Sequence, residues 1–213
     1  MSIIGESADW ADLIDSMVPD ILKLVIASWT EMASPARDEK EDNITEELCR
    51  ILKQNRTSRD LPFQIHIQFV EMEPANNERL GRLDIAFIPT INREDIYFCL
   101  ECKRLNVVSG GTTRSYAAEY VLFGMLRFVT GQYSKAVQHG GMLGYVLDGN
   151  VSRAMTNVEA NIQSQRSALC MSPSGTFMPS TVLENEECAR ETHHDRSHEK
   201  QQVFRIHHLF MAV

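Results

Sequence analysis

Two apolar runs with a few charged residues inside them, 81–88 and 95–103, constrain the fold more than any other part of this sequence. Both are rich in β-branched and aromatic residues, and the segment between them begins with a proline, so the pattern predicts two strands joined by a turn. Side chains alternate between the faces of a strand, which places Glu101 and Lys103 together on one face. Asp84 lies on the preceding strand, so the two strands bring two carboxylates and an ammonium group to one place.

These three side chains have the chemistry of phosphodiester hydrolysis. Mg²⁺ prefers oxygen ligands, and one or two carboxylates, several waters and a substrate phosphate complete its coordination shell. Asp84 and Glu101 supply such ligands, and Lys103 can hold or deprotonate the attacking water. We therefore expect Mg²⁺, or Mn²⁺ in its place, as the cofactor. The alternative is a surface hairpin in which Glu101 and Lys103 form only an ion pair.

The pattern resembles the PD-(D/E)xK nuclease superfamily, whose signature is an aspartate on one strand and Glu-x-Lys on the next. Leu83-Asp84 stands at the first position here, and Glu101-Cys102-Lys103 stands at the second. The resemblance covers residues 82–103 directly and the order of elements from 35 to 146 more loosely. It implies a restriction-endonuclease-like core, with the two acids as metal ligands and the lysine as a catalytic residue.

The rest of the chain predicts helices before and after these strands and further strands towards the end. We expect helices at 9–17, 19–32, 35–55, 116–130 and 151–169, strands at 63–71, 140–147 and 203–211, a flexible loop at 107–115, and no clear pattern from 170 to 190. This order predicts an α/β or α+β fold with a mixed central sheet flanked by helices. The nuclease-like domain is expected over 34–213, after an acidic helical extension over 1–33.

Members of this superfamily often add a third acid from the helix before the sheet. At about 100° per residue, the apolar face of that helix is centred on Ile44, Leu48 and Leu52. Glu41 falls in the same sector, and because a buried acid needs a partner, we prefer Glu41 as the third catalytic carboxylate and metal ligand. Glu47, at the edge of that face, is the second choice. A solvated acid at the positive end of the helix dipole is the alternative role.

Several polar side chains after the Glu-x-Lys strand are candidates for contacting a substrate phosphate. They are Thr112, Thr113, Arg114, Arg127 and Lys135. The first three lie in the expected flexible loop and would position a strand without reading its sequence. The last two, with Tyr133, would line the site from the following helix, although packing and surface charge are their more usual roles.

The net charge of −8 is unusual for a protein that binds nucleic acid, but it is unevenly distributed. The first 50 residues carry 12 acidic and 4 basic side chains, whereas the remainder carries 17 of each. From Arg79 to Lys135 there are 8 basic and 5 acidic residues, so the proposed site is locally basic, as a phosphate backbone requires. The acidic region is expected either to dock a protein partner or to act as a lid that repels nucleic acid.

The cysteines are five, an odd number, which favours reduced thiols and a cytoplasmic location. The longest apolar run, 21–29, contains Lys23 and is too short to cross a bilayer, so no membrane association is expected.

Five of the seven histidines lie after residue 190, but the nearest cysteine, Cys188, stands alone and supplies no cysteine pair of a structural zinc site there. His208 would share a strand face with Phe204, Ile206 and Phe210, which predicts a hydrogen-bonded core residue.

Taken together, these patterns favour a metal-dependent endonuclease that cuts DNA, of the kind used in bacterial defence or restriction. Cutting of both strands would favour a homodimer. Two alternatives remain open at this point. The first is an interaction module of the same fold without activity, and the second is an RNA-processing nuclease, which shares every residue named above.

Overall fold

The computed structural model describes residues 7–72, 80–91, 93, 95–134, 136–172, 176–196 and 203–213. Its helices are α1 (Ser7–Glu31), α2 (Glu41–Ser58), α3 (Ala117–Tyr120), α4 (Leu126–Val129) and α5 (Val151–Ser164), with a π-helical turn, η1 (Val121–Met125), between α3 and α4. Its strands are β1 (Phe63–Glu71), β2 (Gly81–Pro89), β3 (Phe98–Leu105), β4 (Val107–Ser109), β5 (Thr112–Arg114), β6 (His139–Val146), β7 (Met178–Pro179), β8 (Ala189–Asp195) and β9 (Val203–Ala212).

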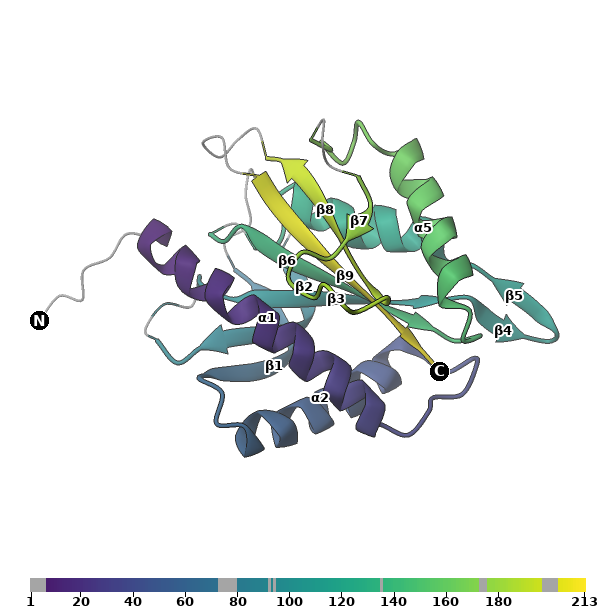
Figure 1. The fold of residues 1–213 in the computed structure, drawn as a ribbon, viewed down its shortest axis with the longest axis horizontal. Coiled ribbons are helices and arrows are strands. Elements are labelled where there is room, and N and C mark those ends of the chain that lie inside the picture. Colours follow the sequence, from purple (N-terminus) through teal and green to yellow (C-terminus); the bar gives the residue numbers. More distant parts are fainter. Residues whose placement is uncertain are drawn as a thin grey trace, which may run out of the picture.

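Seven strands form one mixed sheet in the order β1-β2-β3-β6-β9-β8-β7. β3, β6 and β9 are parallel neighbours, whereas the pairs on either side of them are antiparallel. β4 and β5 form a separate hairpin that projects beyond the end of β3 (Figure 1). The predicted α+β class, with a mixed sheet flanked by helices, is confirmed.

Helices cover both faces of this sheet (Figure 1). On one face, α1 and α2 contribute residues such as Ile21 and Leu48 to a hydrophobic core. On the other face, η1 and α5 contribute Met125 and Val158 to a second core. Strand alternation supplies both cores, because neighbouring side chains of each strand point to opposite faces. No helix in the described part of the chain is long and apolar enough to cross a membrane.

One long helix, α1, occupies the region where the sequence pattern predicted two helices separated at Pro19, so that prediction was wrong. A proline inside a helix removes one backbone hydrogen bond and costs about 3 kcal/mol. Its neighbours Val18 and Ile21 are buried in the core, which holds the helix together across this position. Near the end of α1, Trp29 stacks on Tyr145 of β6 with 5.4 Å between ring centroids. Much of α1 is therefore part of the same core as the sheet.

α2 begins at Glu41, later than the start at Pro35 that the sequence pattern predicted. The carbonyl oxygen of Arg37 accepts a hydrogen bond from the backbone N–H of Val108 in β4. Because the segment before α2 pairs with this neighbouring strand, it does not join the helix. Glu41 consequently lies in the first turn of α2, at the end of the helix nearest β3 and β4.

Two stretches that the sequence pattern left without regular structure contain strands. Residues 107–115, expected as a flexible loop, form the β4–β5 hairpin, which turns through two glycines at positive φ. β7 and β8 were also not predicted. Apart from Ala189, the buried positions of β8 are polar, namely Glu191, Thr192 and His194, so this strand lacks the apolar alternation that identifies a half-buried strand.

Candidate active site

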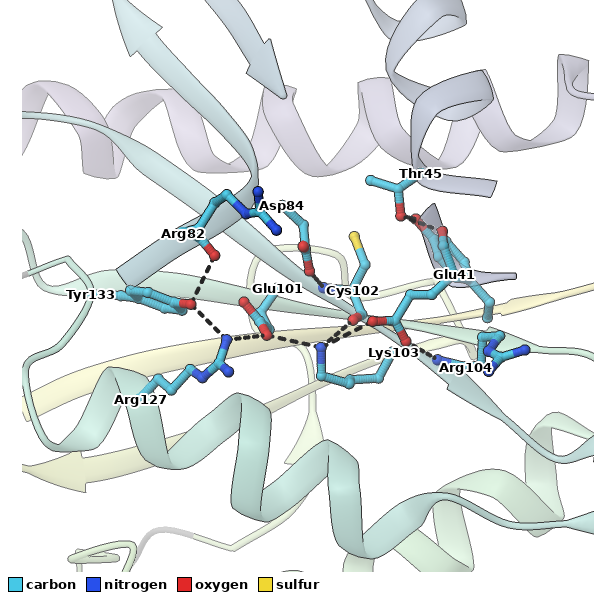
Figure 2. A network of polar contacts seen from close by, with 11 residues as sticks. Glu41, Thr45, Arg82, Asp84, Glu101, Cys102, Lys103, Arg104, Arg127 and Tyr133 are labelled. Carbon is cyan, nitrogen blue, oxygen red and sulfur yellow. Dashed lines mark hydrogen bonds and ion pairs between the residues drawn. The ribbon is translucent and has the colours of Figure 1, made fainter. Parts of the chain in front are cut away.

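The strands β2 and β3 separate at the point where their acidic residues lie. Their pairing ends at Ile85 and Leu100. Just beyond this last pair, the Asp84 carboxylate accepts a hydrogen bond from the backbone N–H of Cys102 at 2.7 Å (Figure 2). This side-chain bond stands where the sheet would otherwise continue with backbone hydrogen bonds. On the other side of β2, Gln68 faces Asp84 in the β1–β2 register and has a φ of 53°, in the left-handed region. Such local backbone strain is concentrated at functional sites.

Glu101 lies at the centre of the cluster, and its side chain is only 2% exposed. Its Oε1 atom accepts hydrogen bonds from Lys103 Nζ at 2.8 Å and from Arg127 Nη1 at 2.9 Å (Figure 2). Its Oε2 atom is buried and has no hydrogen-bond partner among the residues that the structure describes. A buried carboxylate oxygen without a partner is costly, so this atom is available for a ligand that the protein itself does not supply.

Lys103 joins Glu101 to the start of α2. Its ammonium group donates to the Cys102 carbonyl at 2.7 Å and to Glu41 Oε1 at 3.2 Å. The other oxygen of Glu41 accepts the backbone N–H of Arg104 at 2.9 Å. Glu41, Asp84, Glu101 and Lys103 therefore belong to one cluster, as the sequence predicted.

Glu47, the second choice for a third acid, lies apart from this cluster. It forms an exposed ion pair with Arg50, 2.6 Å away on the same helix. Of the two candidate acids on α2, only Glu41 contacts the residues of β3.

Arg127 and Tyr133 close the other side of the cluster. Arg127 Nη1 also donates to the Tyr133 hydroxyl at 2.7 Å, and that hydroxyl donates to the carbonyl of Arg82 at 2.9 Å. The tyrosine ring fills the space over Gly81, where a Cβ atom would come within 2.1 Å of it. This chain of contacts fixes Arg127 against Glu101 and ties the helix to the start of β2.

The helix that carries Arg127 approaches Glu101 through its π-helical turn. Within η1, a Cβ atom on Gly124 would lie 2.3 Å from the Met142 side chain and 3.7 Å from Glu101 Cγ. A glycine is therefore required at this close approach, and π-helical turns are often found at functional sites. No role for Gly124 was predicted from the sequence, although a glycine inside a helical pattern is the signal that could have identified it.

The charges of the cluster shift one another's pKa values. Burial, and then the neighbouring Glu101, raises the pKa of Asp84 to about 7. Burial also raises the pKa of Glu101, although Lys103 and Arg127 oppose it. Burial lowers the pKa of Lys103, but the carboxylates around it outweigh burial and leave that pKa raised. Lys103 is therefore an ammonium group at neutral pH, suited to donating hydrogen bonds rather than to removing a proton.

The cluster fits a hard divalent cation in part. Across the described ranges, no group of three or more His, Cys, Asp and Glu side chains is arranged to hold a metal ion. Asp84 and Glu101 nevertheless offer carboxylate oxygens, and the unpartnered Oε2 of Glu101 is one of them. Mg²⁺ is commonly bound by only one or two carboxylates, with waters and substrate phosphate completing its shell. The donor set therefore suits Mg²⁺ or Mn²⁺ and does not suit a closed structural zinc site.

Three of the remaining predicted substrate contacts lie on β5 and are not joined to the cluster in the described structure. Thr112, Thr113 and Arg114 are exposed on β5, and no contact between them and the carboxylates is found among the described residues. Arg114 instead pairs with Glu119 at 2.8 Å, and its guanidinium lies over a tyrosine ring. Lys135 lies outside the described residues.

The late histidines are mostly core residues. His208 is fully buried, as predicted, and is hydrogen-bonded to the Tyr120 hydroxyl at 3.0 Å and to Thr192 Oγ1 at 2.9 Å. His194 lies in strand β8, and His198 is outside the described residues.

The fold and the cluster together define an α+β protein with two carboxylates and a lysine gathered where two neighbouring strands diverge. Comparison with models of protein families, with curated proteins and with solved structures found no match to this chain. A function for this chain is therefore inferred from its own residues and their contacts.

Proposed function

We propose that this chain is a metal-dependent nuclease of the PD-(D/E)xK type, which hydrolyses phosphodiester bonds and prefers DNA. The observation that carries this proposal is the convergence of Asp84, Glu101 and Lys103 where β2 and β3 separate. Residues from two strands thereby form one cluster in the order that the superfamily signature requires. The partly buried surroundings strengthen the electrostatic interactions of these groups, which is a common feature of active sites.

In this proposal, Asp84 and Glu101 would hold Mg²⁺ or Mn²⁺ through carboxylate oxygens that include the unpartnered Glu101 Oε2. When bound, the metal would neutralise charge on the scissile phosphate and lower the pKa of a water molecule. The raised pKa of Asp84 supports this assignment, because two neighbouring carboxylates that resist joint ionisation favour a shared cation.

The other residues of the cluster act as donors and as supports. Lys103, as an ammonium group, would orient the attacking water and stabilise the negative charge that develops on the phosphate. Arg127 holds Glu101 Oε1 at 2.9 Å and so directs the second carboxylate oxygen away from itself. Residues that hydrogen-bond a metal ligand, as Arg127 does Glu101, commonly fix the orientation of that ligand. Removing such a residue reduces metal affinity or activity by about 10–100-fold.

The proposal is tested by offering the protein duplex DNA, single-stranded DNA and RNA in the presence of Mn²⁺, with Asp84→Asn as the matched variant. Asparagine has the shape of aspartate and can still accept the Cys102 N–H, so the fold is kept while a charged ligand is lost. We expect cleavage of DNA by the wild type and a loss of at least about 100-fold in the variant. Cleavage of RNA alone would assign the RNA-processing class, and equal cleavage by both proteins would exclude this site.

A further inference from the structure

The contacts of Glu41 differ from those of the other two carboxylates in the cluster. Both of its oxygens are used by the protein: Oε1 by the ammonium of Lys103 at 3.2 Å and Oε2 by the backbone N–H of Arg104 at 2.9 Å. Glu101, by contrast, keeps one buried oxygen for which the described part of the chain supplies no partner. Glu41 is also the more exposed of the two, with 30% of its side chain accessible against 2% for Glu101. An acid that is satisfied in this way does not need a metal ion.

The ammonium of Lys103 is itself held like a bound cation. It is surrounded by three oxygens, those of Cys102 at 2.7 Å, Glu101 at 2.8 Å and Glu41 at 3.2 Å. Two of these atoms belong to the strand segment that carries the proposed metal ligand Glu101. A divalent cation approaching Glu101 would therefore meet a positive charge close by, and like charges at such distances repel strongly in a partly buried site.

The position of Glu41 allows the Lys103 ammonium to stay in the cluster when a cation approaches Glu101. It lies at the start of α2, and the Arg104 N–H fixes it beside the lysine. If the ammonium moves away from Glu101, Glu41 is the acceptor that keeps it within the cluster.

We infer that Glu41 is a positioning residue that holds the Lys103 ammonium, and not a metal ligand, and that Lys103 competes with the metal ion for Glu101. This inference rests on the proposed function, and it assigns to Glu41 a role different from the third metal ligand that the superfamily resemblance implied. It makes two claims about binding of the metal alone. Removing the lysine should tighten metal binding, and the effect of removing Glu41 should depend on whether the lysine is present.

The test is a double-mutant cycle on Mn²⁺ affinity, measured by titration calorimetry without nucleic acid. The four proteins are the wild type, Glu41→Gln, Lys103→Met and the double variant. Without the Glu41 charge, the Lys103 ammonium is held by Glu101 and the Cys102 carbonyl and competes more strongly, so Glu41→Gln should lower the affinity by about 3–10-fold when Lys103 is present. In the Lys103→Met background the same change should matter less than about twofold. Lys103→Met alone should raise the affinity by about tenfold.

A metal-ligand role for Glu41 predicts a different result, namely an equal loss of Mn²⁺ affinity in both backgrounds. That result would overturn the inference and leave the proposed nuclease intact. If neither the wild type nor any variant binds Mn²⁺ in a manner that Asp84→Asn removes, the proposed metal site fails, and this inference fails with it.

Two controls keep the cycle interpretable. Glu47→Gln makes the same charge change on the same helix, at an acid that pairs with Arg50 on the surface, and it should leave Mn²⁺ affinity unchanged. Thermal unfolding of each variant checks the fold. If Lys103→Met does not fold, Lys103→Gln replaces it, since glutamine keeps a hydrogen-bond donor and removes the charge.

Discussion

The carboxylate of Asp84 accepts a hydrogen bond from the backbone N–H of Cys102 at 2.7 Å, so a side chain of β2 binds β3 just beyond the last paired residues of the two strands. This bond places Asp84 beside Glu101, and burial together with that neighbour raises the pKa of Asp84 from an ordinary 3.8 to about 7. An unfolded chain loses the Asp84 proton near its ordinary value. Between about pH 4 and 7 the folded protein therefore binds more protons than the unfolded one, and the contribution of Asp84 to the free energy of unfolding falls as the pH rises.

Asp84→Asn should therefore stabilise the metal-free protein, and more so at pH 8 than at pH 5. Asparagine keeps the acceptor for Cys102 N–H but carries no charge next to Glu101. We expect a gain of about 1–3 kcal/mol at pH 8, measured by urea unfolding in the presence of a chelator. A difference between the two proteins that is the same at both pH values would show that Asp84 is not held with a raised pKa.

Arg127→Gln should slow catalysis without unfolding the protein. The guanidinium holds Glu101 Oε1 and the Tyr133 hydroxyl, so its loss releases the carboxylate from its orientation. We expect kcat for plasmid cleavage to fall by about 10–100-fold, with a smaller change in KM. Arg50→Gln, which removes a surface arginine on α2, is the control and should keep wild-type rates. Wild-type activity in Arg127→Gln would mean that Glu101 is oriented by Lys103 alone.

Arg114→Ala should weaken DNA binding without affecting the metal site. Its side chain is 67% exposed on the hairpin, so a phosphate contact there would be electrostatic and independent of sequence. We expect affinity to fall by a similar factor of about 2–5 for all DNA sequences, and the slope of log affinity against log salt to decrease by about one. An unchanged salt slope would remove the hairpin from the binding surface.

A chain of buried hydrogen bonds joins the helical segment after the hairpin to β9 and β8, and its direction can be deduced. The carbonyl of Leu169 only accepts, so His194 Nδ1 donates to it at 2.7 Å. Burial lowers the pKa of His194 to about 4 and that of His208 well below its ordinary 6.5, so both rings are neutral. Thr192 must then donate to His194 Nε2 and accept from His208 Nε2, and Tyr120 donates to His208 Nδ1.

Thr192→Val should break this chain at its centre and leave two buried imidazole nitrogens without partners. We expect a loss of about 2–4 kcal/mol in the free energy of unfolding, measured by urea titration at pH 7.5. Thr113→Val, the same change on the exposed hairpin, should alter it by less than about 0.5 kcal/mol. A loss below 1 kcal/mol in Thr192→Val would show that the histidines find other partners.

The same histidines predict the acid limit of the fold. Since their pKa values are lowered in the folded state, the unfolded chain binds more protons below the ordinary value of 6.5. The stability contributed by neutral His194 and His208 is present above about pH 6.5 and is lost as the pH falls towards 4. The contribution of the histidines to the free energy of unfolding thus rises with pH, whereas that of Asp84 falls. The two contributions are separated by comparing the free energy of unfolding of each variant with that of the wild type at the same pH.

The parts of the fold that could be predicted from the sequence are those that follow local periodicity. β1 begins and ends where the alternation after Pro62 predicted, and Glu101 and Lys103 share a strand face because the side-chain period of a strand is two. Glu41 was also placed correctly in the cluster, although the predicted helix start was wrong. Its sector on the helix surface does not depend on where the helix begins.

The features that could not be predicted depend on distant partners. β8 has buried polar residues, and the hydrogen bonds of Thr192 to His208 of β9 and of His194 to the Leu169 carbonyl make them acceptable in a core. The late start of α2 depends on a bond from β4. The divergence of β2 and β3, which creates the site, is a matter of strand geometry that residue pattern does not encode.

Plasmid cleavage in the presence of Mg²⁺ or Mn²⁺ by the wild type and by Lys103→Ala is the decisive test of the proposed nuclease. We expect metal-dependent nicking or linearisation by the wild type, abolished by a chelator and reduced by at least about 100-fold in Lys103→Ala, with both proteins showing the same folded spectrum. Cleavage by Lys103→Ala at the wild-type rate, or wild-type cleavage that persists without a divalent cation, would exclude this mechanism.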